Sequence, residues 1–148
     1  MTFTEVIPYL YYADADAALD WLERVLGFGP STRWRMGGPH TREADIRVGG
    51  GRISLSGRAP GAGDGAAAGD TAGAGDGAGT GDGAGEGAGA LLIVHVDDIR
   101  AQYERVRAAD PDAAGDPPEK QPYGPTTFTV VDPWGYRWNF WEGEADPP

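Results

Sequence analysis

The chain has 148 residues with 25 glycines, 12 prolines and no cysteine, and its formal net charge is −11 at pH 7. This length fits one domain, and the lack of cysteine excludes disulfides and thiolate chemistry. The acidic balance disfavours nucleic acid, which rewards clustered Lys and Arg. No apolar run is long enough to span a membrane. We therefore expect a cytoplasmic protein that binds neither nucleic acid nor a membrane.

Most of the glycine lies in one tract in the middle of the chain. From Gly57 to Ala90, 34 residues include 14 Gly and 11 Ala and no large apolar side chain. This composition cannot build a core and is typical of a flexible chain. We predict a disordered linker over residues 58–89 between a first module, residues 1–57, and a second module, residues 90–148. Neither module should bury enough apolar surface alone, so the two form one domain.

The first half shows a strand pattern, a helix pattern and three more strand patterns. Glu5–Tyr12 is rich in β-branched and aromatic residues, which indicates a strand. The apolar residues of Ala15–Leu26 fall on one helical stripe, preceded by Asp14 and followed by Gly27, which is suited to end the helix. Three short strands, separated by glycine-rich turns, are predicted next: Ser31–Met36, Arg42–Val48 and Arg52–Ser56.

The same order recurs after the linker. A strand at Leu91–Val96 precedes a helix at Ile99–Ala109, which Asp97 or Asp98 can cap. Three strands are predicted after the helix, the first of them a short edge strand: within Asp116–Gln121, at Thr126–Val131 and at Tyr136–Glu142. Each half therefore has the order β-α-β-β-β, which predicts an α+β fold of two βαβββ modules. The linker is long enough that the modules could pair within one chain or exchange between chains.

Two groups of segments stand out: Ile7–Asp14 followed by Ala18–Leu22 and Val25–Phe28, and Tyr123-Gly124 followed by Asp132–Trp138. They resemble the opening and the closing hairpin of the vicinal oxygen chelate superfamily, which includes glyoxalases, bleomycin-resistance proteins and extradiol dioxygenases. The resemblance covers both halves. It implies two modules whose curled, mixed sheets form a cup that holds a small-molecule ligand, usually in a homodimer.

The resemblance also implies where a metal would bind. Metal-dependent members carry His, Gln or Glu at four inward positions, which fall here on Ile7, Ser54, Leu91 and Asn139. Two apolar side chains, a hydroxyl and an amide cannot hold the usual divalent cation, so we predict no metal and no cofactor. A relocated metal site that combines His95 with carboxylates of the first half remains an alternative.

Alternation of side chains along the strands predicts which residues face the cup. Val6 and Leu10 should turn toward the first helix, while Trp138 and Phe140 should pack behind the last strand. The predicted ligand-binding residues are aromatic with a few polar anchors: Tyr9, Tyr11, Ser54, His95, Arg137, Asn139 and Trp141. Such a lining suits a planar or amphipathic small molecule.

Three functions fit these residues. The first is a metal-independent binding protein, similar to bleomycin-resistance proteins, that protects by sequestering an aromatic or amphipathic compound. The alternative is a glyoxalase- or dioxygenase-like enzyme, a lyase or isomerase, with non-standard metal ligands or with metal-free catalysis by His95 or a carboxylate as base. In the third, the protein's own side chains fill the cup and the role is interaction. The catalytic residues of such an enzyme and the identity of the ligand are unknown from the sequence.

Overall fold

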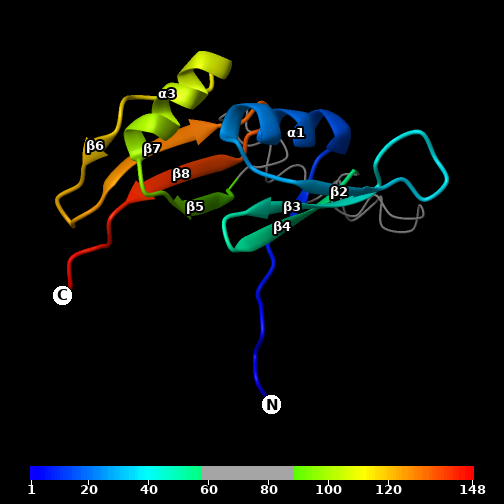
Figure 1. Ribbon diagram of the computed structural model, residues 1–148, viewed down its shortest axis with the longest axis horizontal. Coiled ribbons are helices and arrows are strands. Elements are labelled where there is room, and N and C mark those ends of the chain that lie inside the picture. Colours follow the sequence, from blue (N-terminus) through cyan, green and yellow to red (C-terminus); the bar gives the residue numbers. More distant parts are fainter. Residues whose placement is uncertain (58–88) are drawn as a thin grey trace. The chain divides into compact units, whose positions relative to one another are not determined.

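The computed structural model describes residues 1–57 and 89–148, which belong to two compact units (Figure 1). Each unit contains one four-stranded mixed sheet and one helical segment, in the order β-α-β-β-β. The predicted α+β class and the predicted repeat are therefore confirmed. The expected linker lies outside the described residues, apart from residue 89, and its extent stays a prediction.

The first unit is built on a sheet with strand order β1-β4-β3-β2. Strand β1 runs parallel to β4, and the other neighbours are antiparallel. The elements, in chain order, are β1 (Tyr9–Tyr11), α1 (Ala15–Trp21), the π-helical turn η1 (Leu22–Leu26), β2 (Ser31–Trp34), β3 (Glu43–Val48) and β4 (Gly51–Ser56).

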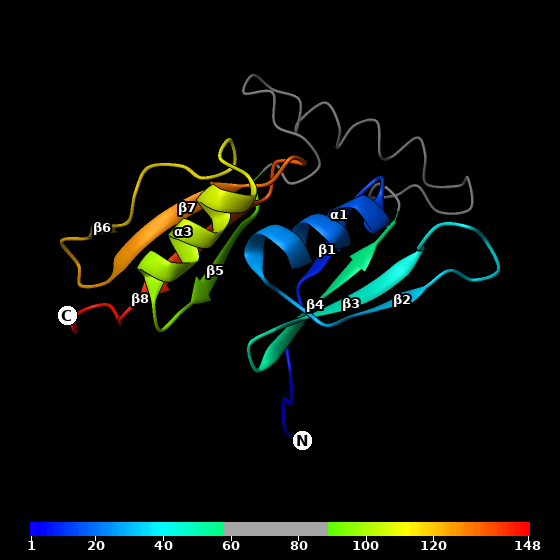
Figure 2. The same cartoon turned by 45° about the horizontal axis from the view of Figure 1, so that its top comes forward.

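The helical segment formed by α1 and η1 begins and ends where the sequence indicates, although its last turn is π-helical. The Asp14 carboxylate accepts a hydrogen bond from the Ala17 amide at 3.0 Å, which satisfies a free donor of the first turn. Gly27 closes the helical segment with φ of 76°, a left-handed conformation that glycine adopts without strain. The predicted apolar stripe is buried against the sheet, and Leu19, Leu22 and Val25 have no exposed surface. Figure 2 shows α1 lying across one face of its sheet.

Strand β1 is shorter than predicted. Because Pro8 has no N–H, it cannot donate to the ladder, and only its carbonyl takes part, accepting from the Ser54 amide at 3.0 Å. The residues before it leave the sheet as an extended arm (Figure 1). Val6 is 92% exposed, so the prediction that it packs toward the helix was wrong. Leu10 does face the helix and is buried.

The second unit repeats this plan with strand order β5-β8-β7-β6, in which β5 is parallel to β8. Its elements are β5 (Leu91–His95), α3 (Ile99–Ala109), β6 (Glu119–Lys120), β7 (Thr126–Val131) and β8 (Arg137–Glu142). Asp98 caps α3 by accepting from the Ala101 amide at 2.9 Å. The bounds of α3 and β7 are those predicted.

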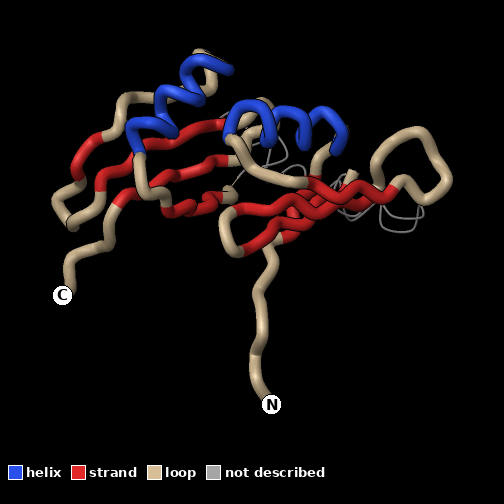
Figure 3. Tube along the Cα trace, in the orientation of Figure 1, coloured by secondary structure: helices blue, strands red, loops and turns tan. Residues whose placement is uncertain are grey.

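The turn between β7 and β8 fixes the packing of the second unit. Gly135 has φ of 95°, as a tight reversal requires, and its amide donates to the Asp132 carbonyl at 3.0 Å. Beyond it, Trp138 and Phe140 are fully buried between the sheet and α3. In both units the helix covers one face of its own sheet (Figure 3), and the predicted site residues lie on the other face. Among the described residues no helix is long and apolar enough to cross a membrane.

Candidate functional site

The uncovered face of the first sheet carries side chains in rows across the strands. Tyr9 on β1 is paired with Ser54 on β4, which is paired with Asp45 on β3. The next row contains Tyr11 and Ser56. The sheet therefore brings together the three predicted site residues of the first unit, Tyr9, Tyr11 and Ser54.

Tyr9 and Tyr11 form an aromatic pair. Their ring centroids are 5.3 Å apart at an interplanar angle of 67°, an edge-to-face contact. The Tyr9 hydroxyl donates to the Glu43 carboxylate. Partial burial, together with this hydrogen bond, raises the pKa of Tyr9 above its ordinary value. The phenol thus stays protonated at neutral pH, and its ring, with Tyr9 45% exposed, offers a flat contact surface.

Ser54 takes part in a charged network rather than standing free. Its hydroxyl donates to Asp45 Oδ1 at 2.6 Å, and Asp45 Oδ2 accepts from Arg52 at 3.0 Å. The same guanidinium donates to Glu5 Oε2 at 3.2 Å, which ties the N-terminal arm to the sheet. The polar anchor of this face is therefore a group of four side chains rather than one serine.

Trp141 is the centre of the site residues in the second unit. Its indole N–H donates to Asn139 Oδ1, and the Asn139 amide donates in turn to Thr129 Oγ1 at 2.8 Å. The Trp141 ring lies 5.7 Å from the His95 ring and 5.8 Å from the Tyr123 ring, centroid to centroid. The second sheet thus brings His95, Asn139 and Trp141 together, as predicted from side-chain alternation.

Arg137 is the predicted residue that lies apart from this aromatic group. It is exposed and paired with Leu91, whereas Trp141 is paired with His95 at the other end of the two strands. Four residues of strand place these ends about 13 Å apart. Leu91, beside Arg137, and Ile93, between the two ends, lie on the same face with more than half of their surface exposed. A ligand stacked on Trp141 would therefore reach Arg137 only if it extended along the strands to the other end of the face.

The residues at the four metal-ligand positions do not fit a divalent cation. Ile7 and Leu91 offer no donor atom, and the side chains of Ser54 and Asn139 are bonded to neighbours on their own sheets. In the described parts of the chain, no group of three or more His, Asp or Glu side chains is placed to hold a metal ion.

Sequence reasoning missed two residues of the second site. Thr129 could have been found, because it lies opposite Asn139 in the register of β7 and β8. Tyr123 belongs to a turn, where no alternation indicates a direction. Its ring contacts Trp141, and its carbonyl accepts from the Asp146 amide at 2.7 Å, which ties the turn to the chain beyond β8.

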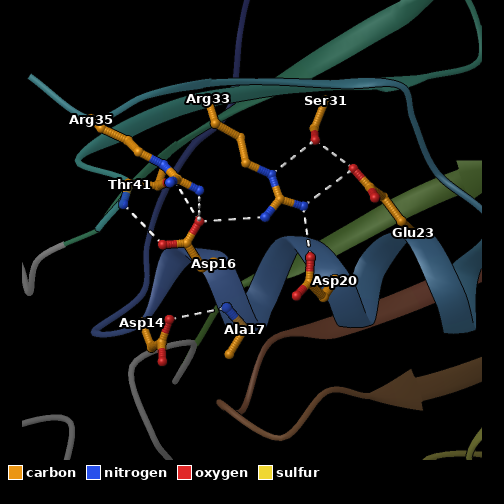
Figure 4. Close-up of polar contacts among 9 residues, drawn as sticks. All are labelled: Asp14, Asp16, Ala17, Asp20, Glu23, Ser31, Arg33, Arg35 and Thr41. Atoms are coloured by element: carbon orange, nitrogen blue, oxygen red, sulfur yellow. Dashed lines mark hydrogen bonds and ion pairs between the residues drawn. The ribbon is translucent and has the colours of Figure 1, made fainter. Parts of the chain in front are cut away.

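A separate polar cluster on the helix side of the first sheet joins α1 to β2 and to the loop between β2 and β3 (Figure 4). Arg33 donates to Asp20 at 2.8 Å and to Asp16 at 3.4 Å. Asp16 also accepts from the hydroxyl and the amide of Thr41, at 2.6 and 2.9 Å. These hydrogen bonds from Thr41 lower the pKa of Asp16 below its ordinary value. The acids are satisfied by these partners, so the cluster holds the helix to the sheet.

The chain was compared with curated proteins and with solved structures. No curated protein matches the chain. Among solved structures, TioX from Micromonospora sp. ML1 is 26% identical, with a TM-score of 0.65 over 98% of this chain and 100% of that one. A bleomycin resistance determinant encoded on the transposon Tn5 is 20% identical, with a TM-score of 0.61 over 96% and 99% of the two chains. A bleomycin-binding protein solved in complex with bleomycin is 21% identical, with a TM-score of 0.59 over 96% and 100%.

The two bleomycin-related structures share the fold with this chain. A sequence model of a protein family also matches the chain. That model matches residues 4–140, which include every element of both units except the last two residues of β8. The two βαβββ units, the Asp132–Gly135 turn and the uncovered sheet faces agree with this match. The chain therefore belongs to the Glyoxalase/Bleomycin resistance protein/Dioxygenase superfamily.

Proposed function

We propose that this protein binds and sequesters an aromatic or amphipathic small molecule without a metal, and so protects against it. The observation that carries the proposal is the composition of the two uncovered sheet faces. Each combines aromatic rings with hydrogen-bonding side chains, and neither presents metal donors at the four positions that metal-dependent relatives use.

The proposed mechanism is stacking with polar orientation. In the first unit Tyr9 and Tyr11 supply flat surfaces, and Ser54 and its partners orient polar groups of a ligand. In the second unit Trp141 supplies the flat surface, and His95, Asn139 and Arg137 supply the polar contacts. One solved structure of the same fold holds bleomycin, and another is a bleomycin resistance determinant. These relatives support a binding role for the fold, and bleomycin is accordingly the first compound to test.

We include in the proposal a homodimer located in the cytoplasm, with neither nucleic acid nor a membrane as partner. The net charge of −11 supports the exclusion of a phosphate backbone. Sedimentation equilibrium tests the homodimer, and fractionation of the native cells tests the location.

The central experiment is a fluorescence titration with bleomycin and a panel of planar aromatic compounds. We expect saturable quenching of tryptophan emission for at least one compound. Trp141→Ala should weaken that binding by roughly 1–3 kcal/mol, the value of a stacked aromatic contact. Trp134→Ala is the matched control, because Trp134 lies in the β7–β8 turn at the other end of β8. Circular dichroism confirms that both variants are folded.

Two results would overturn this function. The first is the absence of saturable quenching with every compound of the panel. The second is binding that Trp141→Ala and Tyr9→Ala leave unchanged in folded protein, since the stacking surfaces would then lie elsewhere.

A second candidate is a metal-free enzyme with His95 as base, and one contact favours it. His95 Nδ1 lies 3.8 Å from Glu144 Oε1, an ion pair when the imidazole is protonated. Both side chains are more than half exposed, so water competes for this contact and the pair is poorly prepared for proton transfer. Turnover of a compound that binds, lost in His95→Gln, would establish this candidate.

A further inference from the structure

A polar cleft of about 360 Å³ opens on the first unit, and its lining includes residues of the sheet face that carries Tyr9. The N-terminal arm, the start of β2, the second half of β3 and the start of β4 contribute to it. Six residues line the cleft: Glu5, Pro30, Thr32, Asp45, Arg47 and Arg52. The volume is sufficient for a small polar group together with part of a ring.

Two arginines lie directly opposite each other in this cleft. Arg47 on β3 is the register partner of Arg52 on β4. Like charges at such a position repel each other unless each is balanced. Arg52 is balanced by its ion pairs with Glu5 and Asp45, at 3.2 and 3.0 Å. In the described parts of the chain, no acidic side chain lies within ion-pair distance of Arg47.

Hydrogen-bonding capacity then decides what the cleft can accept. Its two cationic and two anionic side chains cancel in formal charge. Both oxygens of Asp45 are already used, one by Ser54 and one by Arg52. The Arg47 guanidinium, in contrast, keeps its full set of N–H donors in a planar fork. A group that enters the cleft therefore meets unused donors more than unused acceptors.

We propose that this cleft is a subsite for an anionic oxygen group of the ligand, a carboxylate or a phosphate, bound by the fork of Arg47. The inference rests on the proposed binding function and specifies its ligand class. Arg47 lies opposite Arg52, which precedes Ser54, the register partner of Tyr9, by two residues. The backbone of Arg47 is therefore about 7 Å along the strands and two strand spacings, about 10 Å, across the sheet from that of Tyr9, a gap that the long arginine side chain shortens. An anionic group attached directly to an aromatic ring can therefore enter the cleft while the ring contacts Tyr9.

Three naphthalene compounds test the subsite: 2-naphthoate, 2-naphthyl phosphate and the neutral 2-naphthamide. Binding is followed by NMR on ¹⁵N-labelled protein, with the Nε–Hε signal of Arg47 assigned from Arg47→Gln. We expect at least one anion to bind about tenfold or more tightly than the amide, as a charge-assisted hydrogen bond predicts. The better anion distinguishes carboxylate from phosphate.

Variants then assign this preference to Arg47. In Arg47→Gln the anion and the amide should bind equally, while Arg47→Lys, which keeps the charge and loses the fork, should retain part of the difference. Arg42→Gln is the matched control. It removes the same charge just before β3, at a position that alternation places on the helix side of the sheet, and should leave the preference unchanged.

The outcomes separate the subsite from the binding function. If the amide binds as tightly as both anions, and Arg47→Gln alters neither, the subsite is overturned while aromatic binding stands. If no naphthalene compound binds, acetate and inorganic phosphate probe the cleft alone. A saturable shift of the Arg47 Nε–Hε signal would then keep the subsite and remove the aromatic part of the function. No shift would overturn the subsite as well.

Discussion

Asn139 accepts a hydrogen bond from the indole of Trp141, two residues further along the same face of β8. Its amide nitrogen donates to Thr129 across the sheet at 2.8 Å. In the first unit Ser54 likewise donates to Asp45, its partner across the sheet, at 2.6 Å. At two positions where metal-dependent relatives carry a ligand, the side chain thus binds a neighbour on its own sheet. The hydrogen bond from Trp141 to Asn139 therefore orients the Trp141 ring before a ligand binds.

The first prediction concerns this orientation. Replacement Asn139→Leu removes the acceptor of the Trp141 N–H, and we expect the affinity for an aromatic ligand to fall roughly two- to tenfold. This is the expected cost of ordering one side chain on binding, about 0.5–1.5 kcal/mol. The indole N–H signal of Trp141, assigned from Trp141→Phe, should move toward the position of a solvent-exposed indole in the NMR spectrum.

Thr127→Val is the control for this change. Thr127 lies opposite Trp141 on β7 and is buried, but it is not the residue to which Asn139 is bonded. This variant should keep the indole signal near its wild-type position. An Asn139→Leu protein with unchanged affinity and an unchanged indole signal would show that packing against His95 and Tyr123 alone positions Trp141.

The second prediction concerns Asp132, which holds the β7–β8 turn. One of its oxygens accepts from the amides of Trp134 and Tyr136, at 3.0 and 2.9 Å, and the other accepts from the Trp138 indole at 3.1 Å. Asp132 is 3% exposed, so Asp132→Ala would leave these donors without a partner in the interior. We expect the free energy of unfolding to fall by roughly 3 kcal/mol or more in urea denaturation.

Asp132→Asn keeps the shape and one acceptor oxygen, and it should lose less stability than the alanine variant. A loss below about 1 kcal/mol for Asp132→Ala would mean that water replaces the carboxylate at this turn. In that case the turn conformation would depend on Gly135 rather than on Asp132.

The sequence predicted the fold well where local patterns and packing agree. The limits of α3 are marked by Asp98 at one end and by the break at Asp110 at the other, and the helix is found at the predicted residues. Strand β1 was predicted too long, because a β-rich composition does not reveal that residues before Pro8 have no partner in the sheet. The π-helical end of the first helical segment has no sequence signal that we can identify.

The sequence predicted on which face of the sheet each site residue lies, but it did not predict the hydrogen bonds between their side chains. Alternation correctly placed Tyr9, Ser54 and Trp141 opposite the helices, since strand geometry alone sets that choice. It could not show that Asn139 is bonded to Trp141, or that Arg52 holds two carboxylates. Such contacts depend on strand register and on side-chain rotamers. Several polar side chains of similar type are available, and the sequence does not show which of them will pair.

The third prediction uses the lowered pKa of Asp16. A carboxyl whose pKa is lower in the folded than in the unfolded state stabilises the fold when ionised, and this contribution is lost as it becomes protonated. Stability should therefore begin to fall as the pH drops below about 4, the ordinary pKa of aspartate, and should continue to fall through the lower pKa of the folded state. Urea denaturation at a series of pH values measures this slope.

Asp16→Asn should reduce the slope in that range, because the group that titrates is removed while its bonding to Thr41 is partly kept. Asp97→Asn, an exposed carboxylate between β5 and α3, should leave the slope unchanged. Equal slopes for wild type and Asp16→Asn would assign the acid sensitivity to other carboxylates, and the Asp16–Thr41 contact would then contribute little to pH dependence.

The last prediction concerns metal. Structural and catalytic sites for transition metals use three or four ligands of thiolate, imidazole or carboxylate type, and the chain has no cysteine. Here the four family positions hold Ile7, Ser54, Leu91 and Asn139, and the whole chain contains two histidines. After incubation with zinc, nickel, manganese or ferrous iron and then desalting, we expect the protein to retain well under one equivalent by elemental analysis. The compounds that bind should do so equally with and without a chelator.

Histidine variants make this prediction decisive. In one outcome, the wild-type protein retains one equivalent of metal that His95→Ala loses and His40→Ala keeps. This result would contradict the prediction of a metal-free site, because His95 lies beside Trp141 in the second site. His40 lies in an exposed loop between β2 and β3. Retention that depends on both histidines alike would indicate surface binding, which a chelator should remove without any effect on ligand affinity. Metal dependence of ligand binding itself would refute the proposed function as stated and favour an enzyme with relocated ligands.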